Sequence, residues 1–204
     1  MREKTDQPVL PGAPALGADV ADLIRIAARH TLLPHPDVVA KMNGAMFPSV
    51  RGPMKDRLRV IRHGTSDVLV DDNTTPRWAL FWSHGIRATH SAKGWTVAHL
   101  WPGATVRDPR YYTALGNLAL IAEPLAALSD TSGPFADYLR FHAKAVYGFV
   151  PSGAPIPAEP PGYGAIAWRY LDPIPDPRAF LRGQMLRLAN QRVERLRPLM
   201  WPAQ

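Results

Sequence analysis

Proline limits what this chain can fold into more than any other residue type. The 204 residues include 22 prolines, which is roughly twice the usual share of about 5%. A proline fixes its own φ and has no backbone N–H, so prolines lie at helix starts, turns and strand edges. The sequence therefore predicts short helices and strands joined by stiff connections. The proline-rich stretch 150–177 is expected to be an ordered strap over the surface, pinned to the core around Trp168 and Tyr170.

Apolar periodicity and capping residues predict five helices. They are expected at 19–30 with Asp19 as N-cap, at 36–47, over a turn or two from 74, at 135–149 and from 177 onward. The last is the clearest, because Asp176 can cap it and Pro177 occupies its first turn.

β-Branched and aromatic runs predict strands at 58–62, 67–72, 95–101 and 117–121, the first two joined by a turn at 63–65. Strands and helices together indicate an α+β fold. We expect a short β-hairpin backed by a helix (a ββα-like core), wrapped by several helices, the strap and a basic C-terminal helix. Residues 1–17 are expected to be a flexible leader, and 18–204 one globular domain.

Charge and composition narrow the classes of partner. The chain carries 24 Lys and Arg against 17 Asp and Glu, a net charge of +7, and no cysteine. A basic surface attracts polyanions such as nucleic acid, and the alternative is a basic protein with no such partner. Without cysteine there are no disulfides or thiolate metal ligands. The sequence shows no run of about 18 apolar residues and no secretory signal, so we expect a cytoplasmic protein without a membrane partner.

The segment 95–130 carries the main functional signal. It reads WTVAHLWPGATVRDPRYYTALGNLALIAEPLAALSD. A predicted strand ends at His99, a loop follows, Asn117 opens the next strand, and a short apolar run leads to Asp130. This order resembles the core of HNH (ββα-metal) nucleases, especially the branch with Ala-Ala-His-Ile at the first position and Asn-Gly-Leu-Leu-Leu at the second. The resemblance lies within a core at 94–149.

The resemblance implies specific roles. His99 takes the place of the general base, Asn117 that of the residue that ties the hairpin together and helps to orient the base, and Asp130 that of a closing aspartate. A neutral imidazole suits proton abstraction from water near pH 7. A divalent cation such as Mg²⁺ would offset charge developing on the phosphate.

The sequence departs from the family pattern at two metal-site positions. Ala126 stands where the family places its third histidine, and Ala98 stands before the base where many members have Asp or His. Substitute ligands would have to come from His90, Asp108, Asp130 or His142. Two of these also have a purely structural interpretation, because Asp108 before a proline starts turns and His142 lies among apolar residues of a predicted helix.

Arginines supply the candidate nucleic-acid contacts. Two lie in the loop of the HNH-like segment and four on the last helix: Arg107, Arg110, Arg182, Arg187, Arg192 and Arg195. Guanidinium groups along a helix suit a phosphate backbone, although such a helix can also lie on a membrane surface or simply face solvent. The acidic turn Asp71-Asp72 has two interpretations as well, a metal site or, as we favour, the cap of the following helix.

Three hypotheses follow from the sequence. The first is an HNH-like endonuclease that hydrolyses nucleic acid, DNA more than RNA, with a divalent metal and His99 as base. The second keeps the fold without the reaction, as a nucleic-acid-binding or protein-interaction protein. The third is a structural domain with no polyanion partner.

Overall fold

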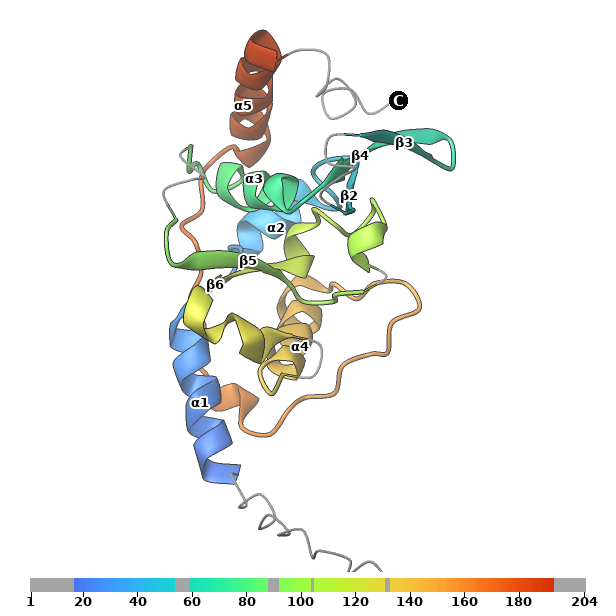
Figure 1. Ribbon diagram of the computed structural model, residues 1–204. Coiled ribbons are helices and arrows are strands. Elements are labelled where there is room, and N and C mark those ends of the chain that lie inside the picture. The colour runs from blue at the N-terminus through green and yellow to red at the C-terminus, as the bar shows by residue number, and fades with distance from the viewer. Residues whose placement is uncertain (1–16, 54–58, 88–91, 104, 131–132, 193–204) are drawn as a thin grey trace, which may run out of the picture.

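The computed structural model describes residues 17–53, 59–87, 92–103, 105–130 and 133–192, with backbone alone for 189–192. Helices and short strands are interspersed along the described chain (Figure 1). In order they are α1 (Gly17–Arg29), β1 (Thr31–Leu32), α2 (Pro36–Met42), β2 (Ser49–Arg51), β3 (Val60–His63), β4 (Ser66–Asp71), α3 (Thr74–Trp82), β5 (Trp95–His99), η2 (Thr105–Arg107), η3 (Leu115–Asn117), β6 (Leu118–Ala122), η4 (Glu123–Ser129), α4 (Ala136–Tyr147), η5 (Tyr163–Ala165) and α5 (Pro177–Arg192). The α+β class is confirmed.

The strands form two separate sheets of three. The first has the order β1-β6-β5, and both of its pairs are antiparallel. The second has the order β2-β4-β3, in which β2 runs parallel to β4 and β3 antiparallel to it. All four predicted strands are present within a few residues of their expected ends. The sequence analysis missed β1 and β2, because strands of two and three residues are too short to show a period.

Strand β6 separates two apolar clusters because successive side chains of a strand point to opposite faces. Leu118 and Leu120 belong to the cluster that includes side chains of α2, α3 and α5. Ala119 and Ile121 belong to the cluster that includes side chains of α1 and α4. The first sheet is therefore covered on both faces, which explains why NLALI reads as a continuous apolar run rather than an alternating one.

Helix boundaries follow the capping residues with two corrections. Asp176 Oδ1 accepts a hydrogen bond from the backbone N–H of Ala179 at 2.9 Å, so it caps α5 as predicted. Asp19 lies inside the first turn of α1 rather than at its N-cap, because that helix begins at Gly17. Helix α2 ends at Met42, earlier than predicted, because Asn43 and Gly44 adopt positive φ of 27° and 90°.

The proline-rich strap is ordered and pinned to the core, as predicted. The N–H of Leu33 donates to the carbonyl of Arg169 at 2.9 Å, and the N–H of Leu171 donates to the carbonyl of Leu33 at 2.8 Å. Trp168 stacks on the buried ring of Phe135, with 5.9 Å between ring centroids. The strap thus joins the strand segment after α1 to the face of α4.

None of the helices within the described ranges is long and apolar enough to cross a bilayer.

Candidate functional site: the His99 hairpin and an arginine hollow

Strands β5 and β6 form the hairpin that the sequence predicted, with His99 paired to Leu118 at the end that adjoins the connecting loop. Asn117 holds the long connection between the strands. Its side chain is fully buried; Oδ1 accepts from the N–H of Trp101 at 3.0 Å, and Nδ2 donates to the carbonyl of Tyr111 at 3.1 Å. Asn117 therefore joins the two ends of this connection, which is the tying role expected for it.

Tyr112 fixes the ring of His99 in two ways. Nε2 of His99 lies 2.9 Å from the carbonyl oxygen of Tyr112. A carbonyl can only accept, so Nε2 carries the proton and the lone pair of the neutral ring is at Nδ1. The two rings stack with centroids 5.1 Å apart and planes 6° apart.

Burial sets the charge state of His99. Its side chain is 8% exposed. The pKa of His99 is lowered to about 4, mainly by desolvation and in small part by the positive charge of Arg51, while the hydrogen bond to Tyr112 acts in the opposite direction. The imidazole is therefore neutral at pH 7, and it is a weaker base than an exposed histidine.

The acidic turn before α3 is a helix cap. Oδ2 of the buried Asp71 accepts from the N–H of Thr75 at 2.6 Å and from its hydroxyl at 2.7 Å. The N–H of Asn73, a residue at φ 82°, donates to the hydroxyl of Tyr112 at 2.8 Å. The favoured interpretation of Asp71 as a cap is confirmed. Tyr112 links the turn to the His99 hairpin.

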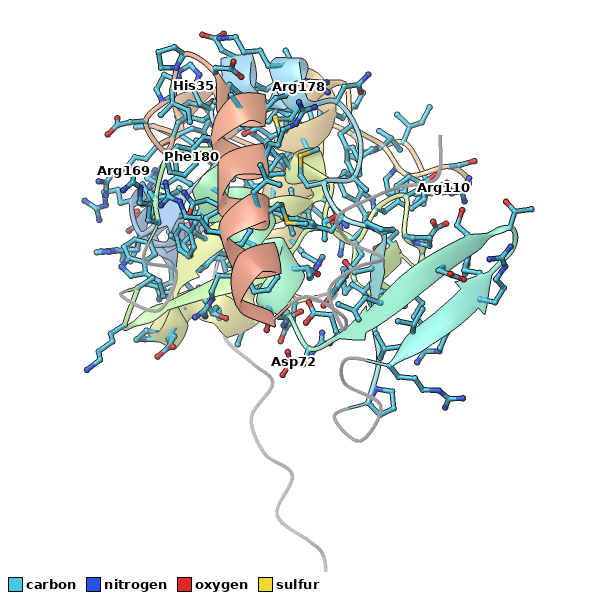
Figure 2. All side chains as sticks on the ribbon, turned by 90° about the horizontal axis from the view of Figure 1, so that it is seen from above. His35, Asp72, Arg110, Arg169, Arg178 and Phe180 are labelled. Atoms are coloured by element: carbon cyan, nitrogen blue, oxygen red, sulfur yellow. The ribbon has the colours of Figure 1, made fainter. Side chains whose placement is uncertain are left out.

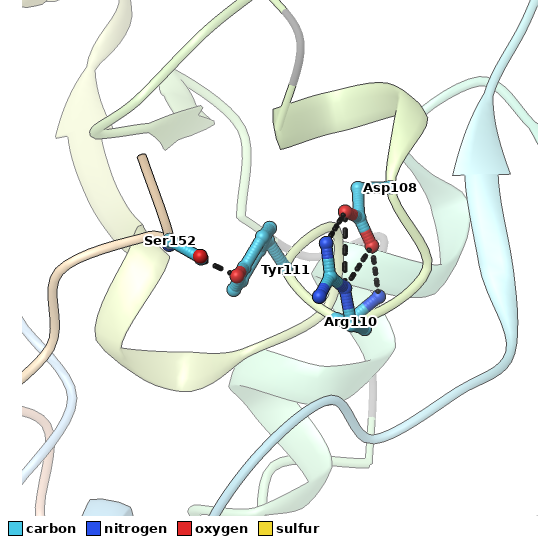
Figure 3. Close-up of polar contacts among 4 residues, drawn as sticks. All are labelled: Asp108, Arg110, Tyr111 and Ser152. Carbon is cyan, nitrogen blue, oxygen red and sulfur yellow. Dashed lines mark hydrogen bonds and ion pairs between the residues drawn. The ribbon is translucent and has the colours of Figure 1, made fainter. Parts of the chain in front are cut away.

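Asp108 is held by a neighbouring arginine (Figure 3). Its carboxylate accepts from Nη2 of Arg110 at 2.6 Å, from Nε at 3.0 and 3.1 Å, and from the backbone N–H of the same residue at 2.9 Å. These hydrogen bonds hold the pKa of Asp108 below its usual value. The guanidinium also lies over the ring of Tyr111, 5.0 Å from its centroid. The pair stabilises a turn, and each charge largely neutralises the other.

Asp108, Asp130 and His142, the predicted metal ligands that the structure describes, do not form a group that could hold a metal ion. Both ring nitrogens of the buried His142 are hydrogen-bonded, Nδ1 to the hydroxyl of Tyr163 at 2.8 Å and Nε2 to that of Tyr170 at 3.1 Å. Asp130 is exposed where η4 ends, and His90 lies outside the described residues. Among the residues that the structure describes, no three His, Asp or Glu side chains lie close enough to hold a metal ion. The described candidates therefore do not fit the divalent cation that the HNH resemblance implies.

The arginines of α5 face solvent on another part of the molecule. Arg182 and Arg187 are exposed, whereas the side chain of Arg192 and all of Arg195 lie outside the description. In Figure 2, Arg178 marks the start of α5, and Arg110 lies on the side that carries the β3–β4 ribbon. Nε of Arg178 donates to the carbonyl of Lys41 at 2.8 Å and so caps α2.

A hollow of about 770 Å³, which we call the arginine hollow, is lined by residues of β2, β3, β4 and η2 and of the segments beside them. Three exposed arginines line it: Arg51 at the end of β2, Arg59 before β3, and Arg107 in η2. The described residues that line it include no acidic side chain. Gly103, Val106 and Arg107 belong to the connection between β5 and β6, so the hollow lies beside the hairpin.

Aliphatic side chains and glycines complete the arginine hollow. Val50, Ile61, Val70 and Val106 lie among its lining residues. At Gly52 an added Cβ would come within 2.3 Å of Cγ1 of Val70, so only glycine lets β2 lie this close to β4. Sequence reasoning named Arg107 but missed Arg51 and Arg59, since only the pairing of β2 and β3 with β4 brings those two segments together.

Comparisons with models of known protein families, with curated proteins and with solved structures find no match to this chain.

Proposed function

We propose that the protein binds nucleic acid in the arginine hollow beside the His99 hairpin. The observation that carries the proposal is the gathering of three exposed arginines, Arg51, Arg59 and Arg107, around one concave surface. Two other arginines have structural roles: Arg110 pairs with Asp108, and Arg178 caps a helix.

Guanidinium groups on separate segments suit a phosphate backbone. Each guanidinium presents a planar fork of N–H donors that matches phosphate oxygens, and a guanidinium remains positively charged at physiological pH. The hollow places three such groups on β2, before β3 and in η2. Binding there would release counterions from the nucleic acid, which makes affinity fall steeply with salt.

Hydrolysis by an HNH-type reaction is our second candidate. It is favoured by the imidazole of His99, which is neutral and fixed by Tyr112 so that the lone pair is at Nδ1. Two observations place it second: the ring is 8% exposed, and the described residues offer no group of metal ligands. We therefore assign no step to a metal.

Salt-dependent binding tests the first candidate. The affinity of a fluorescent oligonucleotide is measured between about 50 and 200 mM salt. The slope of log K against log salt is negative, and each lost phosphate contact reduces its magnitude by about 0.7 to 0.9. We expect Arg51→Ala and Arg107→Ala each to reduce the magnitude of the slope by about this amount. The matched control is Arg62→Ala, an exposed arginine on β3 that pairs with Asp67 at 2.9 Å and does not line the hollow. Equal slopes for all three variants would exclude the hollow as the binding site.

A cleavage assay tests the second candidate. Plasmid, single-stranded DNA and RNA are incubated with Mg²⁺, Mn²⁺ or EDTA. Cutting that His99→Ala abolishes, while binding to the hollow persists, would establish hydrolysis. Binding without cutting under any of these conditions would leave the first candidate alone.

A further inference from the structure

We infer that the arginine hollow takes a single strand of nucleic acid rather than a duplex, with a sugar and base against its aliphatic surface and the phosphates at its arginine rim. The inference rests on the proposed function and names its substrate class. It comes from the aliphatic residues that line the hollow together with the arginines.

The aliphatic surface is contributed by β2, β3, β4 and η2, with Ile61 as the residue from β3. Val50 and Val70 are 4% and 5% exposed, and Val106 is 7% exposed, so they form the floor of the hollow, while the three arginines are exposed. Such a floor gains free energy only against a ligand with an apolar surface of its own.

A duplex does not offer that surface. Its phosphates and sugars lie outside, and the faces of its bases are stacked within. In a single strand the bases are splayed out, and their faces can pack on protein side chains. With its phosphates at Arg51 and Arg107 and a base over Val106, a single strand would contact both the charged rim and the apolar floor of the hollow.

Size points the same way. Pockets of about 300–1,000 Å³ enclose ligands of drug size, and the hollow, at about 770 Å³, falls in this range. A nucleotide unit of a single strand is of that order. In contacts with B-form DNA, a protein element instead enters the DNA, because the major groove, about 12 Å wide, admits a whole helix or β-ribbon. A duplex could meet only the rim.

Strand β3 offers a matched pair of variants. Ile61 lines the hollow, whereas its neighbour Val60 does not line it and is 42% exposed. Successive side chains of a strand point to opposite faces. Ile61→Thr and Val60→Thr both keep a β-branched side chain, so both suit the strand. Only Ile61→Thr puts a hydroxyl in the hollow.

The experiment compares a mixed-sequence strand of about 12 nucleotides, a length within the range bound by single-strand-binding modules, with its blunt duplex at the same salt. We expect the single strand to bind wild type at least about tenfold more tightly. Ile61→Thr should weaken single-strand binding about three- to tenfold without changing the salt slope, because no phosphate contact is lost. Val60→Thr should bind as wild type does. Thermal unfolding of both variants verifies that they fold.

Each other outcome is decisive. Equal or tighter binding of the duplex, or equal affinities of the two threonine variants, overturns the single-strand inference while an effect of Arg107→Ala keeps the proposed function. If neither nucleic acid binds at low salt, the proposed function fails and the inference fails with it.

Discussion

Tyr112 holds His99 in two ways, since its carbonyl oxygen accepts from Nε2 at 2.9 Å and its ring stacks on the imidazole at 5.1 Å. Its hydroxyl reaches the turn between β4 and α3, where it accepts from the N–H of Asn73 at 2.8 Å. One buried residue therefore fixes the tautomer of the histidine and connects its hairpin to the turn that follows β4.

The tautomer of His99 is directly testable. We expect the side-chain ¹H–¹⁵N spectrum to show a neutral ring protonated at Nε2 at pH 7, because Nε2 faces a carbonyl. The ring should titrate with a pKa of about 4, lowered by burial. Titration near the ordinary value of about 6.5, or a proton on Nδ1, would contradict the geometry.

Tyr112→Phe separates the hydroxyl of Tyr112 from its ring and carbonyl. The variant keeps the stacking on His99 but leaves the N–H of Asn73 without its acceptor, which should lower the free energy of unfolding by about 1–3 kcal/mol. Tyr111→Phe is the neighbouring control. Its hydroxyl accepts from the exposed N–H of Ser152 at 3.0 Å, a donor that water can satisfy, so its cost should stay below about 1 kcal/mol. Urea unfolding measures both, and equal costs would show that the Tyr112 hydroxyl is dispensable.

Asn117→Ala should be among the most destabilising polar substitutions. It removes an acceptor from Trp101 N–H and a donor to the Tyr111 carbonyl at a fully buried position, at a cost of about 2–4 kcal/mol for two unpaired groups and a small cavity. The measurement is chemical denaturation, together with the His99 spectrum described above. A loss below about 0.5 kcal/mol, typical of surface sites, would mean that the loop does not depend on this amide.

Mild acid should destabilise the protein. Burial lowers the pKa of His84, His99 and His142 to about 4, below the value of about 6.5 in the unfolded chain. Between these values the unfolded state binds more protons, so the free energy of unfolding is highest above pH 6.5 and falls as the pH drops toward 4. We expect a loss on the order of 1 kcal/mol per histidine by pH 5.

Urea unfolding at a series of pH values measures this loss. His84→Gln should flatten the decline, since that ring accepts from the N–H of His35 at 3.0 Å only while neutral. Substitution of the exposed His30 by Gln should leave the decline as steep as in wild type. Stability that stays level from pH 7 to pH 5 would contradict the three buried neutral rings.

The strap should depend on His142. His142→Phe keeps a ring beside Trp168, whose centroid lies 4.4 Å away, but deletes both hydrogen bonds to Tyr163 and Tyr170. We expect a loss of about 1–3 kcal/mol and faster proteolysis within residues 150–170, because local opening exposes the chain. Unchanged proteolysis would show that the β-bridge at Leu33 is enough to hold the strap.

The strands and most helix starts were predictable because they depend on local signals. Proline at 36 and 177, and the β-branched runs at 67–72 and 95–101, fix their own conformations. The hairpin that pairs His99 with Leu118 was also predicted, because the resemblance to HNH nucleases led us to expect those two segments in one hairpin.

The site was less predictable because it depends on contacts between distant segments. Asp108 was a candidate ligand in the sequence, and only its distance from Arg110 shows that a neighbouring cation holds it. His142 had two interpretations, and the hydroxyls that bind it come from residues more than twenty positions later in the chain. Arg51 joins the hollow through the parallel pairing of β2 with β4, a contact that no local pattern encodes.

Side-chain NMR of the arginines tests the central claim most directly. A single-stranded oligonucleotide is titrated into labelled protein, and the Nε–Hε resonances are followed. Binding in the arginine hollow predicts that the resonances of Arg51, Arg59 and Arg107 shift, while those of Arg182 and Arg187 on α5 stay in place. Shifts confined to α5, or no shift at any arginine at low salt, would contradict it.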